Sequence, residues 1–322
     1  MKLYPLKFKP ILKERLWGGT KLKDVLGKPI TSDITGESWE ISAVPGDVSL
    51  VANGALAGKS LQELIYAYEG RLLGDAVFER FGYEFPILIK FLDARMDLSI
   101  QVHPNDELAR KRHNSFGKTE MWYIMDTERD SRLIIGFKED VSREHYEKCL
   151  AEGSLTDILN YESVQEGDAF FISPGKIHAI GEGILLAEIQ QTSDITYRVF
   201  DFNRKDKEGK TRELHTEMAR EAIDYHFRDD FKVSYPRELN KQNPLIHTPY
   251  FKTDYLELDR DMERKSAAAD SFTIFMCVSG SGELYNESGN IAIKRGETVL
   301  IPACSETIGI RTKKAKFLEV TI

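Results

Sequence analysis

The stretch that decides the fold reads Leu-Ser-Ile-Gln-Val-His-Pro-Asn-Asp and runs from Leu98 to Asp106. Side chains alternate between the two faces of a β-strand, so Ser99, Gln101 and His103 share one face and the apolar residues share the other. Pro104 has no backbone N–H and ends the strand directly after the histidine. We therefore predict that one face of this strand lines a cavity and that the other packs on a core.

Two further segments carry polar side chains within apolar strands. In Gly-Lys-Thr-Glu-Met-Trp-Tyr-Ile-Met, Lys118 and Glu120 alternate onto one face. In Ser-Pro-Gly-Lys-Ile-His-Ala-Ile-Gly, a hydrophobic run turns into His178. Two imidazoles, one carboxylate and one amide oxygen form a suitable nitrogen and oxygen ligand set for zinc. We predict that Gln101, His103, Glu120 and His178 meet around one divalent metal ion, zinc (Zn2+), in each chain.

The composition bounds the class of protein. At 322 residues the chain can hold about two domains, and 41% hydrophobic with 30% charged residues is typical of a soluble globular protein. The net charge of −8 and the lack of a basic stripe argue against a nucleic-acid partner. We expect no membrane span and no secretion signal, because no apolar run is long enough. Three cysteines without metal-ligand spacing fit a reducing compartment, so a cytoplasmic location is expected.

The rest of the chain alternates short strands with a few helices. Residues 1–57 have the composition of strands joined by turns. Helical periodicity predicts three helical segments: 59–81, 142–161 and 212–225. Ser60 and Glu63 form a capping-box pattern in the first of them. Apolar runs predict four strands: 85–92, 132–137, 184–189 and 196–200. Trp17 and Trp39 are candidates to line a sugar site, although covering the core is the commoner role of tryptophan.

The last part of the chain is strand-rich and contains a weak internal repeat. Gly296-Glu-Thr-Val-Leu-Ile-Pro matches Gly167-Asp-Ala-Phe-Phe-Ile-Ser. Phe272-Thr-Ile-Phe-Met matches Met121-Trp-Tyr-Ile-Met. Two copies of one strand-rich unit predict a mainly β fold with two jelly-roll β-barrels and appended short helices.

The repeat also predicts how function divides between the two copies. In this alignment Ser271 stands opposite Glu120 and Thr307 opposite His178, so the second copy lacks the metal ligands. The helical segment 142–161 has no counterpart in the second copy and is interpreted as an insertion in the first. The expected domains are a metal-binding domain over 1–235 with helical insertions and a metal-free, structural β domain over 236–322.

The ligand pattern resembles a known superfamily. Gln-x-His with a later glutamate forms the first half of a cupin motif, and a glycine, an acidic residue, an apolar strand, Pro and His form the second half. The phrase Phe-Pro-Ile-Leu-Ile-Lys-Phe-Leu-Asp-Ala before the opening stretch is more specific. Together with Lys-Thr-Glu-Met-Trp, His178-Ala and Ile195-Thr-Tyr-Arg-Val, it closely resembles type I mannose-6-phosphate isomerases in their shorter bacterial form. The resemblance is strong over Trp17–Asn203.

The resemblance implies an activity and a set of site residues. The family is a zinc-dependent aldose–ketose isomerase that interconverts mannose 6-phosphate and fructose 6-phosphate by proton transfer through a cis-enediol. Its metal ligands correspond to the four residues named above, and its catalytic arginine corresponds to Arg198. Ser99 and Lys118 match positions of the substrate pocket, and Glu188 matches an acidic residue near the metal. The general base stays open between Glu188, Lys118 and a zinc-bound water.

Two other functions stay open at this stage. A different metal-dependent cupin enzyme, such as an iron oxygenase, would use more histidines, and Gln101 in the first ligand position argues against it. A non-catalytic sugar-phosphate-binding cupin is the second alternative, and the complete ligand set with Arg198 argues against it. The expected partner is a small sugar phosphate, and the expected state is a monomer, with a dimer left open.

Overall fold

The first β region consists of two facing antiparallel sheets. The computed structural model describes residues 2–205, 208–266 and 270–322. One sheet has, in spatial order, β15 (Lys232–Val233), β11 (Ala169–Ile172), β8 (Glu120–Thr127), β13 (Ile184–Gln191), β6 (Ile87–Ala94), β3 (Thr35–Ile41) and β2 (Ile11–Gly19). The other has β10 (Leu159–Ser163), β9 (Arg132–Phe137), β12 (His178–Ile180), β7 (Ile100–Val102) and β14 (Tyr197–Phe200). A small hairpin joins β4 (Ala43–Val44) to β5 (Asp47–Val48).

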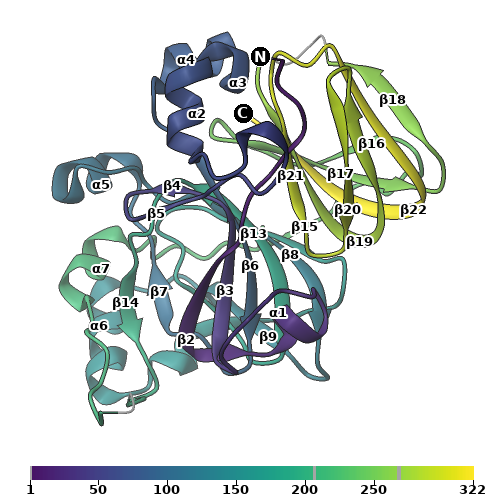
Figure 1. Cartoon of the computed structure of the whole chain (residues 1–322). Coiled ribbons are helices and arrows are strands. Elements are labelled where there is room, and N and C mark those ends of the chain that lie inside the picture. Colours follow the sequence, from purple (N-terminus) through teal and green to yellow (C-terminus); the bar gives the residue numbers. More distant parts are fainter. Residues whose placement is uncertain (1, 206–207, 267–269) are drawn as a thin grey trace.

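The second β region is one sheet that includes the N-terminal strand. Its central path is β1 (Leu6–Lys7), β21 (Thr298–Ile301), β19 (Thr273–Asn286), β22 (Thr307–Thr321), β17 (Lys252–Leu258) and β16 (Gln242–His247). The strand β18 (Met262–Lys265) pairs with β22, and β20 (Gly289–Lys294) pairs with β19. This region forms the upper right of Figure 1. Since β1 pairs with β21, the first strand of the chain belongs to the C-terminal sheet.

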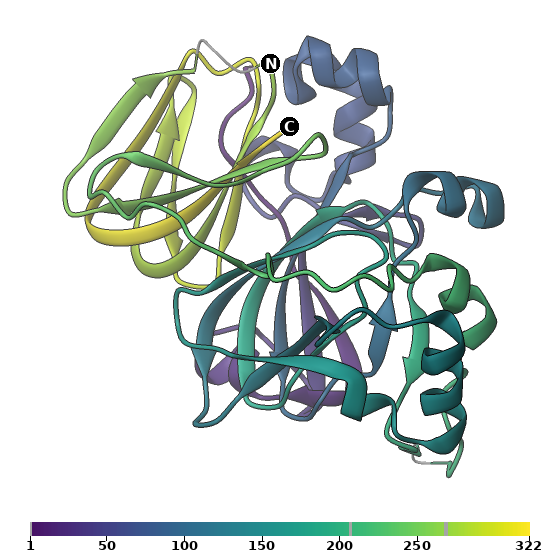
Figure 2. The same cartoon turned by 180° about the vertical axis from the view of Figure 1, so that it is seen from behind.

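Short helices cover the outer faces of the sheets. They are α1 (Lys21–Asp24), α2 (Leu61–Tyr68), α3 (Gly70–Leu73), α4 (Asp75–Phe81), α5 (Asp106–His113), α6 (Arg143–Glu152) and α7 (Thr216–Ala222), with 3₁₀ turns at Gly54–Leu56 and Leu155–Ile158. Helices α2 to α4 lie beside the C-terminal sheet, whereas α5 to α7 flank the first region (Figures 1 and 2). In the part of the chain described here, no helix has the length and apolar character needed to cross a bilayer.

Alternation along the strands divides the core into layers. On β8, Trp122 and Ile124 point into the apolar layer between the two sheets, and Met121 and Tyr123 point to the opposite face. The opposite face forms one continuous core with α2 to α4 and the C-terminal sheet, in which Phe85 stacks on Phe272 with ring centroids 5.0 Å apart. The predicted mainly β fold with short helices is confirmed, and the two β regions share a core.

The helix predictions were partly right. Ser60 and Glu63 form the expected capping box of α2. The prediction of a helix over 142–161 was wrong beyond Glu152, because Gly153 adopts a left-handed conformation with φ of 75° and residues from Leu159 form β10. Of the segment 212–225, only Thr216–Ala222 is helical. The strand prediction for 132–137 agrees with β9.

The internal repeat is a pair of similar antiparallel strand pairs, with a register that differs from the sequence alignment by two residues. Glu120 of β8 pairs with Ile172 of β11, and Thr273 of β19 pairs with Ile301 of β21. Thr273 rather than Ser271 therefore stands at the position of Glu120. A shift by an even number of residues leaves the same residues on the interior face, so the alternation of interior and exterior side chains in the repeat is preserved. The proposed boundary between 235 and 236 falls between β15 and β16, and it stays a prediction.

Candidate active site

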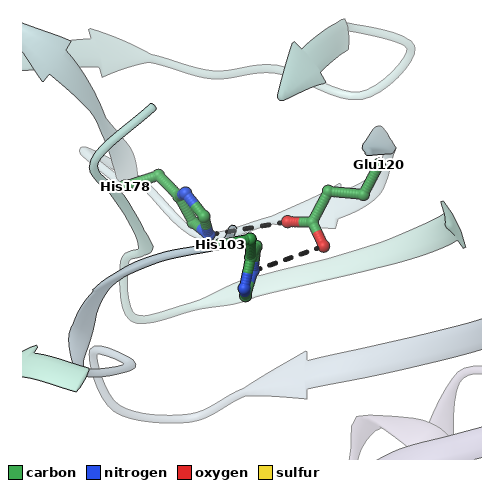
Figure 3. Close-up of side chains that lie close together, drawn as sticks. All are labelled: His103, Glu120 and His178. Carbon is green, nitrogen blue, oxygen red and sulfur yellow. Dashed lines mark ion pairs between the residues drawn. The ribbon is translucent and has the colours of Figure 1, made fainter. Parts of the chain in front are cut away.

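Three of the four predicted metal ligands converge between the two sheets of the first region (Figure 3). His103 follows β7 and His178 opens β12, while Glu120 opens β8 in the facing sheet. One ligand atom from each residue lies within 4.8 Å of the other two. The Oε2 atom of Glu120 is 3.6 Å from Nε2 of His103, and its Oε1 atom is 3.5 Å from Nε2 of His178. All three side chains are buried.

Gln101 lies at the edge of this cluster. Its backbone pairs with His178 on one side and with Arg198 on the other, so the three side chains form one row across the sheet. The amide Nε2 atom of Gln101 is 3.3 Å from Nε2 of His178. An exchange of the amide oxygen and nitrogen, which an amide flip allows, would present the oxygen to the cluster.

Backbone carbonyls orient both imidazoles. Nδ1 of His103 lies 2.9 Å from the carbonyl oxygen of Ile195, and Nδ1 of His178 lies 2.7 Å from that of Lys176. With Nδ1–H donated to the carbonyl, the lone pair of Nε2 faces Glu120. Burial lowers the pKa of His178 to about 3 and that of His103 well below its ordinary value. Both rings are therefore neutral, which is the form that binds metal.

Glu120 is the feature that most directly indicates a cation. Neither of its buried oxygens accepts a well-directed hydrogen bond from the described residues, although Nζ of Lys118 lies 2.9 Å from Oε2. Burial raises the pKa of Glu120 to about 7, and the charge of Lys118 opposes this rise. A buried carboxylate without hydrogen bonds is costly unless a cation compensates it. The donor set therefore fits a divalent metal ion.

A second group of buried charges lies on the same interior face. Glu188 of β13 accepts a hydrogen bond from Nζ of Lys90 at 3.0 Å and another from Nε1 of Trp122 at 3.0 Å. Burial alone would raise the pKa of Glu188, but Lys90 and Lys118 more than offset it and the pKa is lowered. Nζ of Lys118 also lies 3.2 Å from Nε2 of His103. Glu188 is thus ionised and Lys118 reaches the metal cluster.

These side chains border a cavity of about 450 Å³. Trp17 and Trp39 line it while remaining buried, so they fill the core and form the cavity wall at once. Five cationic side chains line the cavity: Arg15, Lys90, Lys118, Arg198 and Arg212. Three anionic ones, Glu37, Glu188 and Asp194, leave an excess of two positive charges in a chain whose net charge is −8. Such local charge attracts an anionic ligand.

Comparison with known proteins decides the family. Residues 5–133 match the model of the phosphomannose isomerase type I catalytic domain, and residues 241–319 match that of the mannose-6-phosphate isomerase cupin domain. The chain is 36% identical to the probable mannose-6-phosphate isomerase GmuF of Bacillus subtilis (strain 168), over 93% of this chain and 94% of that protein. It is 37% identical to mannose-6-phosphate isomerase ManA of the same organism, over 92% and 93%. The chain belongs to the type I phosphomannose isomerase family.

Solved structures agree with this assignment. The crystal structure of the mannose 6-phosphate isomerase from Bacillus subtilis aligns with a TM-score of 0.90 at 32% identity, over 99% of this chain and 100% of that one. Phosphomannose isomerase from Salmonella typhimurium in its apo form shares the fold with a TM-score of 0.78 at 17% identity, over 98% of both chains. The resemblance drawn from the sequence is confirmed, together with the enzyme class and the cupin fold.

In this phosphomannose isomerase, five charged side chains that line the cavity were missed at the level of sequence: Arg15, Glu37, Lys90, Asp194 and Arg212. Lys90 and Arg212 show two different reasons. Lys90 is a lysine inside the apolar run of β6, and that position was itself a usable signal. Arg212 lies on an irregular loop before α7, where no periodicity marks it. Its Nε donates to Oδ2 of Asp201 at 2.7 Å, and its NH2 pairs with Oδ1 of the same carboxylate. Asp201 therefore fixes Arg212 at the cavity.

Arg198 reaches the same cavity from β14. Its NH1 donates to the carbonyl oxygen of Glu213 at 2.8 Å, and its buried Nε has no hydrogen-bond partner among the described residues. Ser99, the residue before β7, lines the cavity as well. All eight predicted site residues of this phosphomannose isomerase thus lie in or beside one cavity, between the two sheets.

Proposed function

We propose that this enzyme interconverts mannose 6-phosphate and fructose 6-phosphate and that it holds one zinc ion per chain. Membership of the phosphomannose isomerase family supports the substrates. The observation that carries the proposal is the buried group of His103, Glu120 and His178 beside a cavity with excess positive charge.

The proposed metal ligands are Gln101, His103, Glu120 and His178. Neutral imidazoles together with carboxylate and amide oxygens suit zinc. When bound, zinc would supply a Lewis acid that stabilises negative charge on a sugar oxygen. Because each imidazole donates its Nδ1–H to a carbonyl, the ring orientation is set before the metal arrives.

The proposed reaction moves a proton between C1 and C2 of the sugar through a cis-enediol. Glu188 and Lys118 are both candidates for the base, since both line the cavity. Burial alone would lower the pKa of Lys118, but Glu120 and Glu188 raise it and favour the ammonium, whereas the lowered pKa of Glu188 favours the carboxylate that accepts a proton. The permanently charged Arg198 can take one of two proposed roles: it stabilises the negative charge that develops on oxygen, or it holds the anionic phosphate. Lys90 keeps Glu188 ionised and fixed, because its ammonium lies 3.0 Å from the carboxylate.

The proposed phosphate position lies at Arg198 and Arg212, with Ser99 as a neutral hydrogen-bond donor. Guanidinium groups match the geometry of phosphate oxygens and stay charged at every working pH. Binding the phosphate there would leave the C1–C2 end of the sugar directed toward the metal cluster. Lys118 is a further candidate contact to the substrate.

An isomerase assay with mannose 6-phosphate tests the proposal directly. Activity should disappear on treatment with a chelator and return on addition of zinc. His103→Ala should abolish activity and zinc binding while the circular dichroism spectrum is retained. His247→Ala is the matched control, because His247 is an exposed histidine of the C-terminal sheet. A zinc-loaded enzyme that binds mannose 6-phosphate without turning it over would favour the non-catalytic cupin instead, and oxygen consumption with bound iron would favour an oxygenase.

Location and assembly are also proposals. All three cysteines, Cys149, Cys277 and Cys304, carry free thiols, which fits the reducing conditions of the cytoplasm. A monomer remains the expected state, and light scattering of the purified protein would measure it.

A further inference from the structure

One carboxylate outside the cavity connects the segments that carry two of the metal ligands. Oδ1 of Asp106 accepts a hydrogen bond from the backbone N–H of Gly117 at 2.8 Å and another from Nε2 of Gln191 at 3.1 Å. Oδ2 of Asp106 accepts a hydrogen bond from the hydroxyl of Tyr250 at 2.8 Å. We call Asp106, Gly117, Gln191 and Tyr250 the Asp106 brace.

Two members of the Asp106 brace lie close in sequence to His103 and Glu120. Asp106 lies three residues after His103, at the start of α5. Gly117 lies three residues before Glu120, and the side-chain oxygen of Gln191 accepts a hydrogen bond from the backbone N–H of Thr119 at 2.8 Å. The brace therefore restrains the separation between the backbone that carries His103 and the backbone that carries Glu120.

The packing at Gly117 has no room for a side chain. A Cβ atom on this residue would lie 2.6 Å from the backbone nitrogen of Asp106 and 2.7 Å from the carbonyl carbon of Asn105. These are backbone atoms, which cannot move aside as a flexible side chain would. The glycine thus lets the loop before β8 touch the N-terminus of α5, which holds the Asp106 carboxylate within reach.

The outermost member of the brace comes from the other β region. Tyr250 lies on the turn between β16 and β17, and its neighbour Pro249 accepts a hydrogen bond from NH1 of Arg80 at 2.8 Å. The β16–β17 hairpin extends toward the helices α2 to α4 (Figure 2). The Tyr250 hydroxyl donates a hydrogen bond to the second oxygen of Asp106 and so restrains the rotation of the carboxylate.

We infer that Tyr250 and Asp106 are positioning residues, through which the C-terminal region holds the His103 and Glu120 segments at the spacing that binds the metal. This inference rests on the proposed metal site. It gives the C-terminal sheet a role in the active site although none of its described residues lines the cavity. Outer hydrogen-bond partners of metal ligands commonly change metal affinity by about 10- to 100-fold. Because Tyr250 lies one step further out, we expect an effect of about 10-fold or less from its loss.

Two variants test the inference on the full chain. Tyr250→Phe removes only the hydroxyl, and Asp106→Asn replaces one acceptor oxygen with a donor. Both should weaken zinc binding, measured by competition with a chromogenic chelator, and Asp106→Asn should have the larger effect. In metal-free protein, the backbone amides of residues 117–119 should exchange hydrogen about 10-fold faster. Tyr285→Phe is the matched control, because its hydroxyl donates to Glu263 at 2.7 Å in the same C-terminal sheet.

The measurements separate this inference from the proposed function. If wild-type protein fails to bind zinc, the proposed metal site is wrong, and the hydrogen-exchange comparison still reports whether the brace orders the loop. If wild type binds zinc while both variants match it in affinity and in amide exchange, the positioning role is overturned. Weaker zinc binding in Tyr285→Phe of the same size would also overturn it, since the effect would then be a general loss of stability.

Discussion

The two β regions contain similar antiparallel strand pairs, β8 with β11 and β19 with β21, but different interiors. In the first, the backbone of Ile124 bonds to the turn at Gly167, and in the second the backbone of Cys277 bonds to the turn at Gly296 in the same pattern. Four residues before those positions stand Glu120 and Thr273, both on the interior face. The same backbone therefore presents the carboxylate of a proposed metal site in one region and a small hydroxyl in the other, so the difference lies in the side chains.

The two interiors differ in how they affect the free energy of folding. The C-terminal interior is mainly apolar and is filled by residues such as Phe275, Phe317 and Ile310, while its buried Glu319 pairs with Arg264. The first region buries Lys90, Glu188 and the metal cluster between its sheets. Buried ions cost free energy of desolvation that even well-formed pairs recover only in part. The comparison indicates that the C-terminal region contributes stability, while the first region retains the buried charges to which we assign the proposed reaction.

The largest expected effect comes from removing the proposed metal ligand that distinguishes the two strand pairs. Glu120→Ala should lower kcat/KM for mannose 6-phosphate by about 1000-fold, equivalent to about 4 kcal/mol, because the metal site loses its charged ligand. Thr273→Ala, at the matching position, should leave the activity of the folded enzyme within about twofold of wild type. Steady-state kinetics and zinc content measure both. Equal losses in the two variants would contradict the division of roles.

The next prediction tests the C-terminal region by removing a large side chain from its interior. Phe317 is fully buried and lies with its ring centroid 6.1 Å from that of Phe275. Phe317→Ala should lower the free energy of unfolding by about 3–5 kcal/mol through lost burial and the cavity left behind. Urea denaturation measures this loss, and kcat per folded molecule should be unchanged. A variant of unchanged stability would show that the C-terminal region does not carry the expected share of the packing.

The sequence predicted which residues gather at the cavity better than it predicted the boundaries of the elements. Strand alternation and Pro104 located Gln101 and His103 because the period of two is local. Arg212 was missed because an arginine on a loop acquires a role only through residues distant in sequence. Lys90 was missed although its position inside an apolar run was a local signal. The helix over 142–161 was overextended because tertiary pairing with β9 overrides the apolar periodicity after Gly153.

The register of the repeat was missed for a related reason. An even shift keeps every side chain on its predicted face, so the apolar pattern cannot distinguish Ser271 from Thr273 as the counterpart of Glu120. The hydrogen bonds between strands distinguish them, and those depend on where the turn closes. The Asp106 brace could not be predicted from the sequence either, because Tyr250 lies 144 residues from Asp106.

A third prediction uses pH to compare the buried charges with the surface of the C-terminal region. Burial alone would raise the pKa of Glu37, but the charges of Lys90 and Arg15 lower it to about 2 from the ordinary 4.5. A lowered pKa stabilises the folded state above pH 4.5, and this stabilisation is lost as pH falls from 4.5 toward 2. The shift corresponds to about 3 kcal/mol.

Glu37→Gln should therefore flatten the acid dependence of stability. Urea denaturation of metal-free protein between pH 5 and about pH 2.5 measures the slope. The variant should start less stable than wild type at pH 5, since Arg15 and Lys90 lose a partner, and should lose less stability on acidification. Glu306→Gln, an exposed residue of the C-terminal region, is the control. Parallel curves for wild type and Glu37→Gln would refute the assigned shift.

The smallest predicted effect separates two arginine–carboxylate pairs that each make two hydrogen bonds. Arg212 binds both oxygens of Asp201 at the cavity, and Arg264 binds both oxygens of Glu319 in the C-terminal sheet. Lysine keeps the charge of each arginine but loses the planar fork that can hold a carboxylate and a phosphate together. Arg212→Lys should therefore raise KM for mannose 6-phosphate by about 10-fold, or about 1.4 kcal/mol, with a smaller change in kcat.

Arg264→Lys controls for the loss of such a pair as a structural contact. It should leave KM unchanged, because Arg264 does not line the cavity. Mannose without its phosphate, used as a competing ligand, gives the sharper comparison: its inhibition constant should be the same for wild type and Arg212→Lys. A KM that rises equally in both lysine variants would mean that Arg212 acts on the fold, and the phosphate would then have to be assigned to Arg198 and Ser99 alone.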